Sequence, residues 1–333
     1  METLYVTRDS QLSRDENTLR IDFPEGGLRR FPIESLRHVV CLNSFTMTSK
    51  LLELCGQHGV RVSFFNHYGI FRGAFEPIDK SPSGEVVLRQ SALILDPDRR
   101  LALAQAFVVG SGRNALNLLK KVLHNRTAQD SVELKSSVVA LERLVDQCSH
   151  AKGIEDLMGR EGMWRSYYYN AWPLVDGRLE MGGRVRRPPN NPINALVSFL
   201  NQMLYANVLH QLSKTHLFSG LSFLHSPSRS RASLALDVAE VFRPVFVDRL
   251  IFRWVRTGVF KETWFERPDE GVCLLSESGL RQVLELWRSE LEAKQGNGSR
   301  QDVIHRECVA LERFGERAAG KVRRGGQRLG FHL

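Results

Sequence analysis

The chain has 333 residues, of which 42% are hydrophobic and 25% charged. This balance is typical of a folded globular protein and excludes a disordered or fibrous chain. Lysine and arginine number 46 against 37 aspartates and glutamates, which gives a formal net charge of +9. Such an excess favours an anionic partner: nucleic acid, an acidic membrane surface or a polyphosphate. A basic tail or an ordinary soluble enzyme gives similar arithmetic.

The cysteines and the apolar runs predict the compartment. The five cysteines lie far apart and form no C-x-x-C pair, which argues against a zinc module and a disulfide scaffold and predicts reduced core thiols. The N-terminus has no apolar signal core, and no apolar run approaches the ~20 residues that span a bilayer. We therefore expect a cytoplasmic protein that is neither secreted nor inserted in a membrane.

The first 76 residues predict mainly strands. Alternating or short apolar runs occur at 4–6, 19–23, 31–33, 37–42 and 60–65. Turn-forming residues at 24–27 and 66–69 separate them. One helix interrupts the strands; Thr48 or Ser49 is placed to cap it, and it ends at Gly56. A small β-rich domain is therefore expected at residues 1–76.

Beyond a Pro-, Ser- and Gly-rich stretch, where we expect a linker at 77–90, the pattern becomes helical. Asp96-Pro97 is a helix start, with Asp as the cap and Pro in the first turn. Amphipathic stretches then occur at 97–124, 130–148, 151–171, 192–214, 233–257, 277–294 and 299–318. The predicted fold class is α+β, with the β-rich domain followed by a larger all-α-helical domain at 91–333.

Two places combine a metal-type ligand with unusual surroundings. Glu161 stands between two glycines, next to Arg160 and ahead of Arg165 and three tyrosines. The ordinary alternative is a solvated glutamate paired with one of these arginines. His225 follows an apolar triplet; it is either a ligand or a satisfied buried histidine. The loop after it carries Arg229 and Arg231, which suit phosphate contact.

A third place is the apolar stretch that contains Asp237 and Glu240. Three residues apart, they share one face of a helix, which Pro244 should kink just beyond them. Burying two carboxylates is costly unless they bind a cation or meet arginines. The alternative is a first helical turn capped by Ser233, where carboxylates suit the helix dipole. Together the three places supply enough carboxylate and imidazole to hold Mg²⁺ or Mn²⁺, which would favour phosphodiester chemistry.

These stretches resemble the CRISPR-associated integrase family, the catalytic subunit of the spacer-acquisition complex of antiviral defence. The resemblance covers nearly the whole chain and is strongest at 158–162, 223–225 and 233–244. It implies an N-terminal β-domain for dimerisation and a helical catalytic domain. Two departures stand out: Glu240 is Asp in some relatives, and the segment before His225 looks shorter than in many. The resemblance implies these roles: metal ligands Glu161, His225 and Glu240; Asp237 behind them or as an alternative ligand; DNA contacts Arg243 and, more weakly, Arg165, with Arg229 and Arg231 assigned by residue type only.

The resemblance also implies the reaction and the partners. A 3′-hydroxyl of prespacer DNA attacks a phosphodiester of the CRISPR repeat array with the help of Mg²⁺ or Mn²⁺, and water in its place gives endonuclease activity, an EC 3.1-type hydrolysis. The implied partners are double-stranded DNA, a second copy in a homodimer, and a small ferredoxin-like CRISPR-associated protein.

Three other functions compete with the integrase reaction. A non-catalytic DNA-binding scaffold of the same complex remains the main one. A metal-independent hydrolase is weaker, because Gly110-Ser111-Gly112 lacks the strand–turn–helix setting of a nucleophile elbow. A PD-(D/E)xK-type nuclease is weaker too, because residues 267–270 have no following lysine at the required place.

Overall fold

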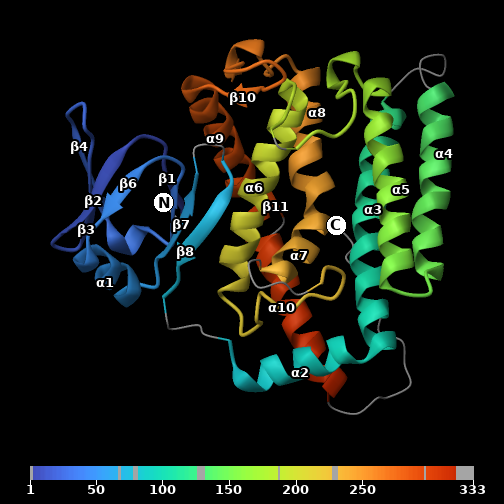
Figure 1. Cartoon of the computed structure of the whole chain (residues 1–333), viewed down its shortest axis with the longest axis horizontal. Helices are drawn as coiled ribbons and strands as arrows, with labels where there is room; N and C mark the ends of the chain where they lie inside the picture. The colour runs from blue at the N-terminus through green and yellow to red at the C-terminus, as the bar shows by residue number, and fades with distance from the viewer. Residues whose placement is uncertain are drawn as a thin grey trace. The chain divides into compact units, whose positions relative to one another are not determined.

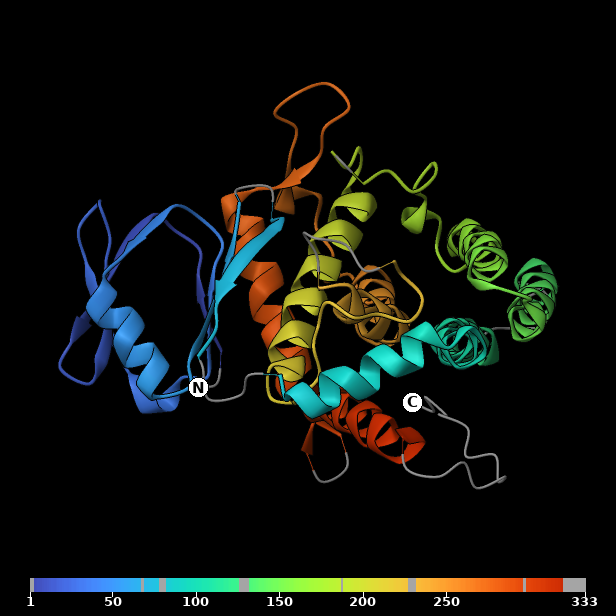
Figure 2. The same cartoon turned by 60° about the horizontal axis from the view of Figure 1, so that its bottom comes forward.

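A computed structural model describes residues 3–66, 69–77, 82–125, 132–186, 188–226, 232–295 and 298–319. The chain forms two compact units (Figures 1 and 2). The strand-rich unit is Met1–Ser81 with Leu275–Ser289, and the helical unit is Pro82–Leu274 with Glu290–Leu333. Strands dominate as far as Phe75 and helices follow, so the predicted α+β class is confirmed.

The strand-rich unit contains two four-stranded sheets and helix α1 (Ser49–Gln57). The sheet orders are β1-β5-β7-β8, with its first three strands parallel, and β4-β3-β2-β6. The strands are β1 (Thr3–Val6), β2 (Ser10–Asp15), β3 (Thr18–Asp22), β4 (Leu28–Pro32), β5 (His38–Cys41), β6 (Phe45–Met47), β7 (Arg61–Phe65) and β8 (Phe71–Phe75).

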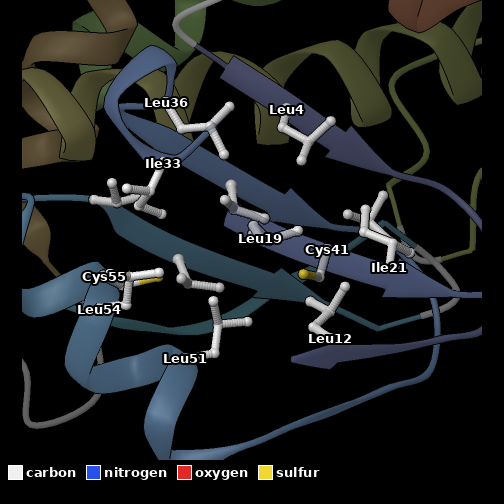
Figure 3. Packing of buried hydrophobic residues seen from close by; sticks show 14 residues of the cluster. Leu4, Leu12, Leu19, Ile21, Ile33, Leu36, Cys41, Leu51, Leu54 and Cys55 are labelled. Atoms are coloured by element: carbon white, nitrogen blue, oxygen red, sulfur yellow. The ribbon is translucent and has the colours of Figure 1, made fainter. Parts of the chain in front are cut away.

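Period-two alternation decides which side chains enter this unit's core. In β3, Leu19 and Ile21 are buried and the residues between them are not, because successive side chains of a strand point to opposite faces. Figure 3 shows these two side chains packed with Leu51 and Leu54 of α1. The turn predicted at 24–27 is present, and its two glycines have φ of 90° and 111°, a backbone region that favours glycine.

Strands β2, β6 and β8 were not recognised in the sequence. In β2 only Ser10 and Leu12 are buried, so this strand lacks the run of apolar residues on which recognition depends. Each of the three is held by pairing to a neighbour; β2, for example, lies between β3 and β6. The pairing of β2 with β6 joins segments distant in sequence, which a local pattern does not reveal, whereas β2 with β3 and β7 with β8 are pairs of consecutive strands.

The helical unit begins earlier than expected. Helix α2 (Gly84–Leu95) starts inside the predicted linker 77–90 and buries Val86 and Leu93 on one face; the turn-rich composition there marks the approach to the helix, not a linker through residue 90. The segment Leu275–Ser289, expected in the helical domain, groups with the strand-rich unit, where Glu277 lies 3.5 Å from Arg8. Periodicity predicts a helix but not the body on which it packs.

The expected long helices are present within a few residues of their predicted bounds. They are α3 (Pro97–His124), α4 (Val132–Gln147), α5 (Ile154–Asn170), α6 (Pro192–Leu212), α7 (Ser233–Arg243), α8 (Arg249–Arg256), α9 (Glu277–Glu292) and α10 (Arg300–Ala319). Asp96 caps α3 as predicted, accepting the backbone N–H groups of Asp98 and Arg99 at 3.1 Å.

Shorter elements connect these helices. A π-helical turn, Pro244–Asp248, separates α7 from α8. The regular α-helix is therefore interrupted at the proline, where a kink was predicted. The 3₁₀ turns are Ile33–Ser35, Cys148–His150, Trp172–Leu174, Gly177–Leu179 and Glu262–Trp264. Two-residue strands are β9 (Phe265–Glu266), β10 (Leu274–Leu275), β11 (Lys294–Gln295) and β12 (Gly298–Ser299). No helix in the described part of the chain is both long and apolar enough to cross a membrane.

Helix α3 is the centre on which α4, α5 and α7 pack; α3, α4 and α5 are seen nearly end-on in Figure 2. Because Pro244 has no N–H, the carbonyl of Glu240 lacks its usual helical donor. Ser111 of α3 donates its hydroxyl to that carbonyl at 2.7 Å, and Asn114 donates to the next carbonyl, of Val241, at 3.0 Å. These buried bonds fix α7 on α3 at the residue that carries a candidate ligand.

Candidate functional site

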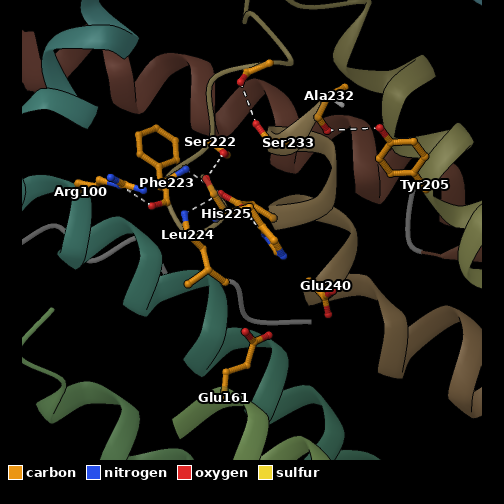
Figure 4. A network of polar contacts seen from close by, with 12 residues as sticks. Arg100, Glu161, Tyr205, Ser222, Phe223, Leu224, His225, Ala232, Ser233 and Glu240 are labelled. Atoms are coloured by element: carbon orange, nitrogen blue, oxygen red, sulfur yellow. Dashed lines mark hydrogen bonds and ion pairs between the residues drawn. The ribbon is translucent and has the colours of Figure 1, made fainter. Parts of the chain in front are cut away.

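Three separate segments of the helical unit carry the candidate metal ligands. Glu161 projects from α5, Glu240 from α7, and His225 from the segment between α6 and α7; Figure 4 shows them facing a common region. The side chains of Glu161 and Glu240 are 12% and 10% exposed, and that of His225 is 29% exposed. Burial at this level requires that each carboxylate meet a cation.

The His225 segment is held by Asp237 of α7, which is fully buried. One carboxylate oxygen of Asp237 accepts the backbone N–H groups of Phe223 and Leu224 at 2.7 and 3.0 Å. The other accepts the N–H of His225 at 3.2 Å and lies 2.7 Å from its Nδ1. Held in this way, the ring keeps Nε2 as the nitrogen that a ligand would take. The hydrogen bond to Asp237 raises the pKa of His225 above its usual value; burial opposes this, and the charges of Asp237, Glu240 and Glu161 add to it.

Further contacts fix the backbone on either side of this histidine. Arg100 of α3 donates to the carbonyl of Phe223 at 2.9 Å, and Ser222 donates to the carbonyl of His225. The ring of Phe223 stacks on Phe107 with centroids 6.2 Å apart. Residues 222–226 therefore have a defined conformation around His225 although they lie outside any helix or strand.

The alternative of a capped first turn for Asp237 and Glu240 is wrong. Ser233 is the first residue of α7, and its hydroxyl donates to the carbonyl of Gly220 at 2.8 Å. The N-cap position is Ala232, whose side chain caps nothing, and the first turn of α7 holds no acidic residue. The two carboxylates lie deeper in the helix, where its dipole offers little compensation.

The glutamates instead meet two arginines. Arg165 Nη2 lies 2.6 Å from Glu161 Oε1 and 2.5 Å from Glu240 Oε2, and Arg243 pairs with the second carboxylate oxygen of Glu240. Glu161 is therefore paired with Arg165, as the ordinary alternative expected, but it is not solvated. Within the described residues, no three His, Cys, Asp or Glu side chains are grouped closely enough to hold an ion as they stand.

The charges of this cluster reinforce one another. Burial alone would raise the pKa of Glu240, but Arg165 and Arg243 outweigh it and hold that pKa below its usual value. Burial would lower the pKa of Arg165, yet Glu240 and Glu161 raise it. Glu240 and Arg165 therefore both remain charged near neutral pH. The cluster as a whole pairs two carboxylates with two guanidiniums.

A further buried acid, Asp248, was missed in the sequence. It is 1% exposed at the end of the π-helical turn, and Tyr168 donates its hydroxyl to one carboxylate oxygen at 3.0 Å. The other oxygen is buried and has no hydrogen-bond partner among the residues that the structure describes. Burial raises the pKa of Asp248 to about 7, against the lowering effects of Tyr168, Arg165 and Arg243. An acid that ends the apolar run at 245–247 was the sequence feature that could have revealed it.

Of the four predicted DNA-contacting arginines, two lie at the site in the structure. Arg165 and Arg243 are 13% and 17% exposed and engaged with the glutamates, so the structure brings them to the site. Arg229 and Arg231 lie outside the described residues.

All five cysteines are free and buried, as predicted.

Comparisons with known proteins point to one family. The sequence model of the family described as "CRISPR associated protein Cas1" matches residues 4–289. The chain is 37% identical over 292 residues to a CRISPR-associated endonuclease Cas1 of Moorella thermoacetica, with 88% of this chain and 87% of the relative covered. A Cas1 structure from Thermotoga maritima matches with a TM-score of 0.86 at 28% identity, covering 98% of this chain and 100% of that one.

Two more distant structures share the fold. A casposase bound to integration product matches with a TM-score of 0.80 at 18% identity, covering 100% of this chain and 96% of that one. A Cas6-RT-Cas1–Cas2 complex matches with a TM-score of 0.79 at 19% identity, covering 95% of this chain and 35% of that one. The family model and the Moorella relative each match most of the chain, and the chain belongs to the Cas1 family of CRISPR-associated proteins.

Proposed function

We propose that the chain is a metal-dependent DNA integrase and endonuclease of CRISPR adaptation. It would insert prespacer DNA into the repeat array, using Mg²⁺ or Mn²⁺ held by Glu161, His225 and Glu240. The observation that carries the proposal is the pair of nearly buried glutamates, from α5 and α7, that face one histidine ring (Figure 4). Membership of a family whose relatives are named endonucleases supports the same activity.

The donor set fits a hard divalent ion. Two carboxylates and one imidazole suit Mn²⁺, and Mg²⁺ accepts the oxygens and keeps several waters. The glutamates already bracket a cation, since one nitrogen of Arg165 lies within 2.6 Å of both. Asp237 would act from behind by holding the ring of His225, because both of its oxygens are used by the backbone and by Nδ1.

The chemistry is a phosphoryl transfer. The 3′-hydroxyl oxygen bonds to phosphorus, the bond to the 3′-oxygen of the repeat strand breaks, and the hydroxyl proton passes to that leaving oxygen by way of solvent. One phosphodiester replaces another, so no energy source is needed. When bound, the ion would polarise the phosphodiester and stabilise the attacking and leaving oxygens. Arg243, beside Glu240, is placed to neutralise a phosphate oxygen.

The proposed partners follow from the family and the charge. A net charge of +9 suits double-stranded DNA, recognised largely through its backbone. The proposed roles of residues 1–76 in a homodimer and of a small ferredoxin-like partner rest on the family, and the same fold occurs in a Cas6-RT-Cas1–Cas2 complex. The free buried cysteines suit the cytoplasm, where the repeat array is found.

One observation favours the alternative, a non-catalytic DNA-binding scaffold. Arg165 and Arg243 together neutralise both glutamates without an ion. A scaffold that had lost catalysis would need nothing more than these ion pairs to tolerate the buried acids.

A prespacer integration assay separates the two functions. Wild-type protein with its partner should join prespacer to repeat DNA in Mn²⁺ or Mg²⁺ but not in EDTA, whereas His225→Ala should lose strand transfer and keep most of its DNA affinity. Integration by His225→Ala at the wild-type rate would remove the metal assignment. Wild-type protein that binds DNA but never joins it would establish the scaffold.

A further inference from the structure

One nitrogen atom joins the two proposed ligands. Arg165 Nη2 lies 2.6 Å from Glu161 Oε1 and 2.5 Å from Glu240 Oε2, and the arginine side chain is 13% exposed. Arg243 differs: its ion pair is with Glu240, three residues before it on the same helix. Arg165 is therefore the cation that spans α5 and α7, and it does so at the place where a shared ion would bind.

We propose that Arg165 acts as an internal competitor of the metal: its guanidinium fills the space between Glu161 and Glu240 in the metal-free protein, and a divalent ion must displace it to bind. This inference rests on the proposed function, because it concerns the same site. It assigns to Arg165 a regulatory role that is distinct from contact with DNA.

The distances do not allow the guanidinium of Arg165 and a divalent ion to lie between the two glutamates at the same time. A small divalent ion bridging these two oxygens needs about 2.0–2.2 Å to each of them. Nη2 already lies within hydrogen-bond distance of both oxygens, so an ion between the same two atoms would overlap the guanidinium. The oxygen of Glu240 that faces Arg165 makes a close ion pair but no well-directed hydrogen bond with the described residues. This oxygen therefore remains available as a ligand atom for a metal ion.

The charges of the cluster also oppose binding of an ion beside Arg165. Two glutamates balance Arg165 and Arg243, so the metal-free cluster is close to neutral. A divalent ion added beside unmoved arginines would place four positive charges next to two negative ones in a nearly buried site, where repulsion is poorly screened. Withdrawal of Arg165 lowers this excess from two positive charges to one.

Movement of Arg165 would also break its contact with Trp164. Besides the glutamates, the guanidinium of Arg165 lies 4.9 Å from the ring centroid of Trp164, a contact that is weak compared with two buried ion pairs. Arg160, one turn earlier on α5, offers a matched control. It pairs with Asp156 at 2.7 Å and with the carbonyl of Gln147, not with the proposed ligands.

Binding of Mn²⁺ to the full-length protein without DNA tests the proposal. Titration followed by electron paramagnetic resonance of free Mn²⁺ would compare wild type with Arg165→Met, Arg165→Lys, Arg160→Met and Glu161→Gln. Methionine keeps an unbranched side chain beside Trp164 and removes the charge. We expect Arg165→Met to bind Mn²⁺ about tenfold or more tightly than wild type, Arg165→Lys to stay close to wild type, Arg160→Met to be unchanged and Glu161→Gln to bind weakly.

The outcomes distinguish this proposal from the proposed function. If wild type binds Mn²⁺, Glu161→Gln does not, and Arg165→Met shows no gain while melting like wild type, the competition is refuted and the metal site stands. If no variant binds Mn²⁺, or if Glu161→Gln binds as well as wild type, both the site and the competition are refuted.

Tryptophan fluorescence gives a second readout that a fixed arginine would not move. Mg²⁺, which does not quench, should change the emission of wild type as the guanidinium leaves the ring of Trp164. The change should disappear in Trp164→Phe and in Arg165→Met. Saturation with Mg²⁺, shown by calorimetry, without any emission change in wild type would mean that Arg165 stays in place and the proposal is wrong.

Discussion

Asp237 Oδ1 lies 2.7 Å from His225 Nδ1, and the same carboxylate accepts the backbone N–H groups of three consecutive residues, Phe223 to His225. A single buried side chain therefore fixes both the backbone and the ring of the proposed histidine ligand. Ser222 and Arg100 add bonds to the carbonyls of the same segment. The position of this imidazole is set before any ion binds, which is the arrangement that metal-ligating histidines usually require.

Asp237→Asn tests this role. The amide keeps the size of the side chain but loses its charge and one acceptor oxygen, so the ring and the loop are held less firmly. We expect Mn²⁺ affinity to fall about 10- to 100-fold and the melting temperature to drop. Calorimetric titration and a thermal melt measure the two effects. Asp156→Asn, which changes a half-buried acid on α5 that accepts from the N–H of Lys152 and from Arg160, should leave Mn²⁺ affinity unchanged; equal Mn²⁺ affinity in wild type and Asp237→Asn would contradict the role.

Local patterns were sufficient for much of the fold. The alternation of Leu19 and Ile21 and the Asp96-Pro97 helix start were recognised because each depends only on neighbouring residues, and both are confirmed. Strand β2 was missed because its only buried apolar residue is Leu12. The grouping of Leu275–Ser289 with the strand-rich unit was missed because packing between distant segments leaves no local pattern.

The site was predicted in its members but not in its connections. Glu161, His225 and Glu240 were found through motifs, and they face one region as expected (Figure 4). The bridge that Arg165 makes between α5 and α7 depends on how the two helices pack, so the residue could be named in advance but its contacts could not. The metal itself stays a prediction.

Glu290 offers a stability test in the helical unit. Its side chain is 1% exposed and forms ion pairs with Arg249, Arg253 and Arg300. Arg253 Nη2 lies 3.0 Å from Glu290 Oε2. Burial and mutual repulsion lower the pKa values of Arg249 and Arg300. Glu290→Gln would leave three guanidiniums facing one another, and we expect a loss of about 3–5 kcal/mol in the free energy of unfolding.

The matched variant is Arg253→Met. Arg253 is 47% exposed, so its ion pair is screened by solvent and its removal should cost less than about 1 kcal/mol. Urea unfolding of both variants measures the asymmetry. Similar losses for the two substitutions would mean that the buried carboxylate is not the centre of this cluster.

Arg243→Ala tests a phosphate contact beside the site. If Arg243 meets a DNA phosphate, the affinity for duplex DNA should fall to a similar extent for all sequences, and the slope of log affinity against log salt should decrease by about 1. Fluorescence anisotropy across a salt series measures both. Lys120→Ala, which removes a cation paired with Glu142 at 2.7 Å, is the control for total charge. An unchanged slope in Arg243→Ala would remove this residue from the contacts.

Asp248 should make stability depend on pH. Burial raises its pKa in the folded protein to about 7 from a usual value of 3.8, so between these values the folded state holds a proton that the unfolded state has released. The free energy of unfolding therefore falls as pH rises through this window and levels off above it. The shift of roughly three units corresponds to about 4 kcal/mol.

Asp248→Asn removes this dependence while keeping an oxygen that accepts from Tyr168. Urea unfolding of wild type and Asp248→Asn at pH 5, 6, 7 and 8 should show the variant gaining on wild type as pH rises. Asp22→Asn is the control of opposite sign: Arg20 lowers the pKa of that half-buried carboxyl, so its effect should be constant over pH 5–8 and change only in acid. A constant difference between wild type and Asp248→Asn over the same range would show that Asp248 is ionised throughout, with Tyr168 and the nearby arginines outweighing its burial.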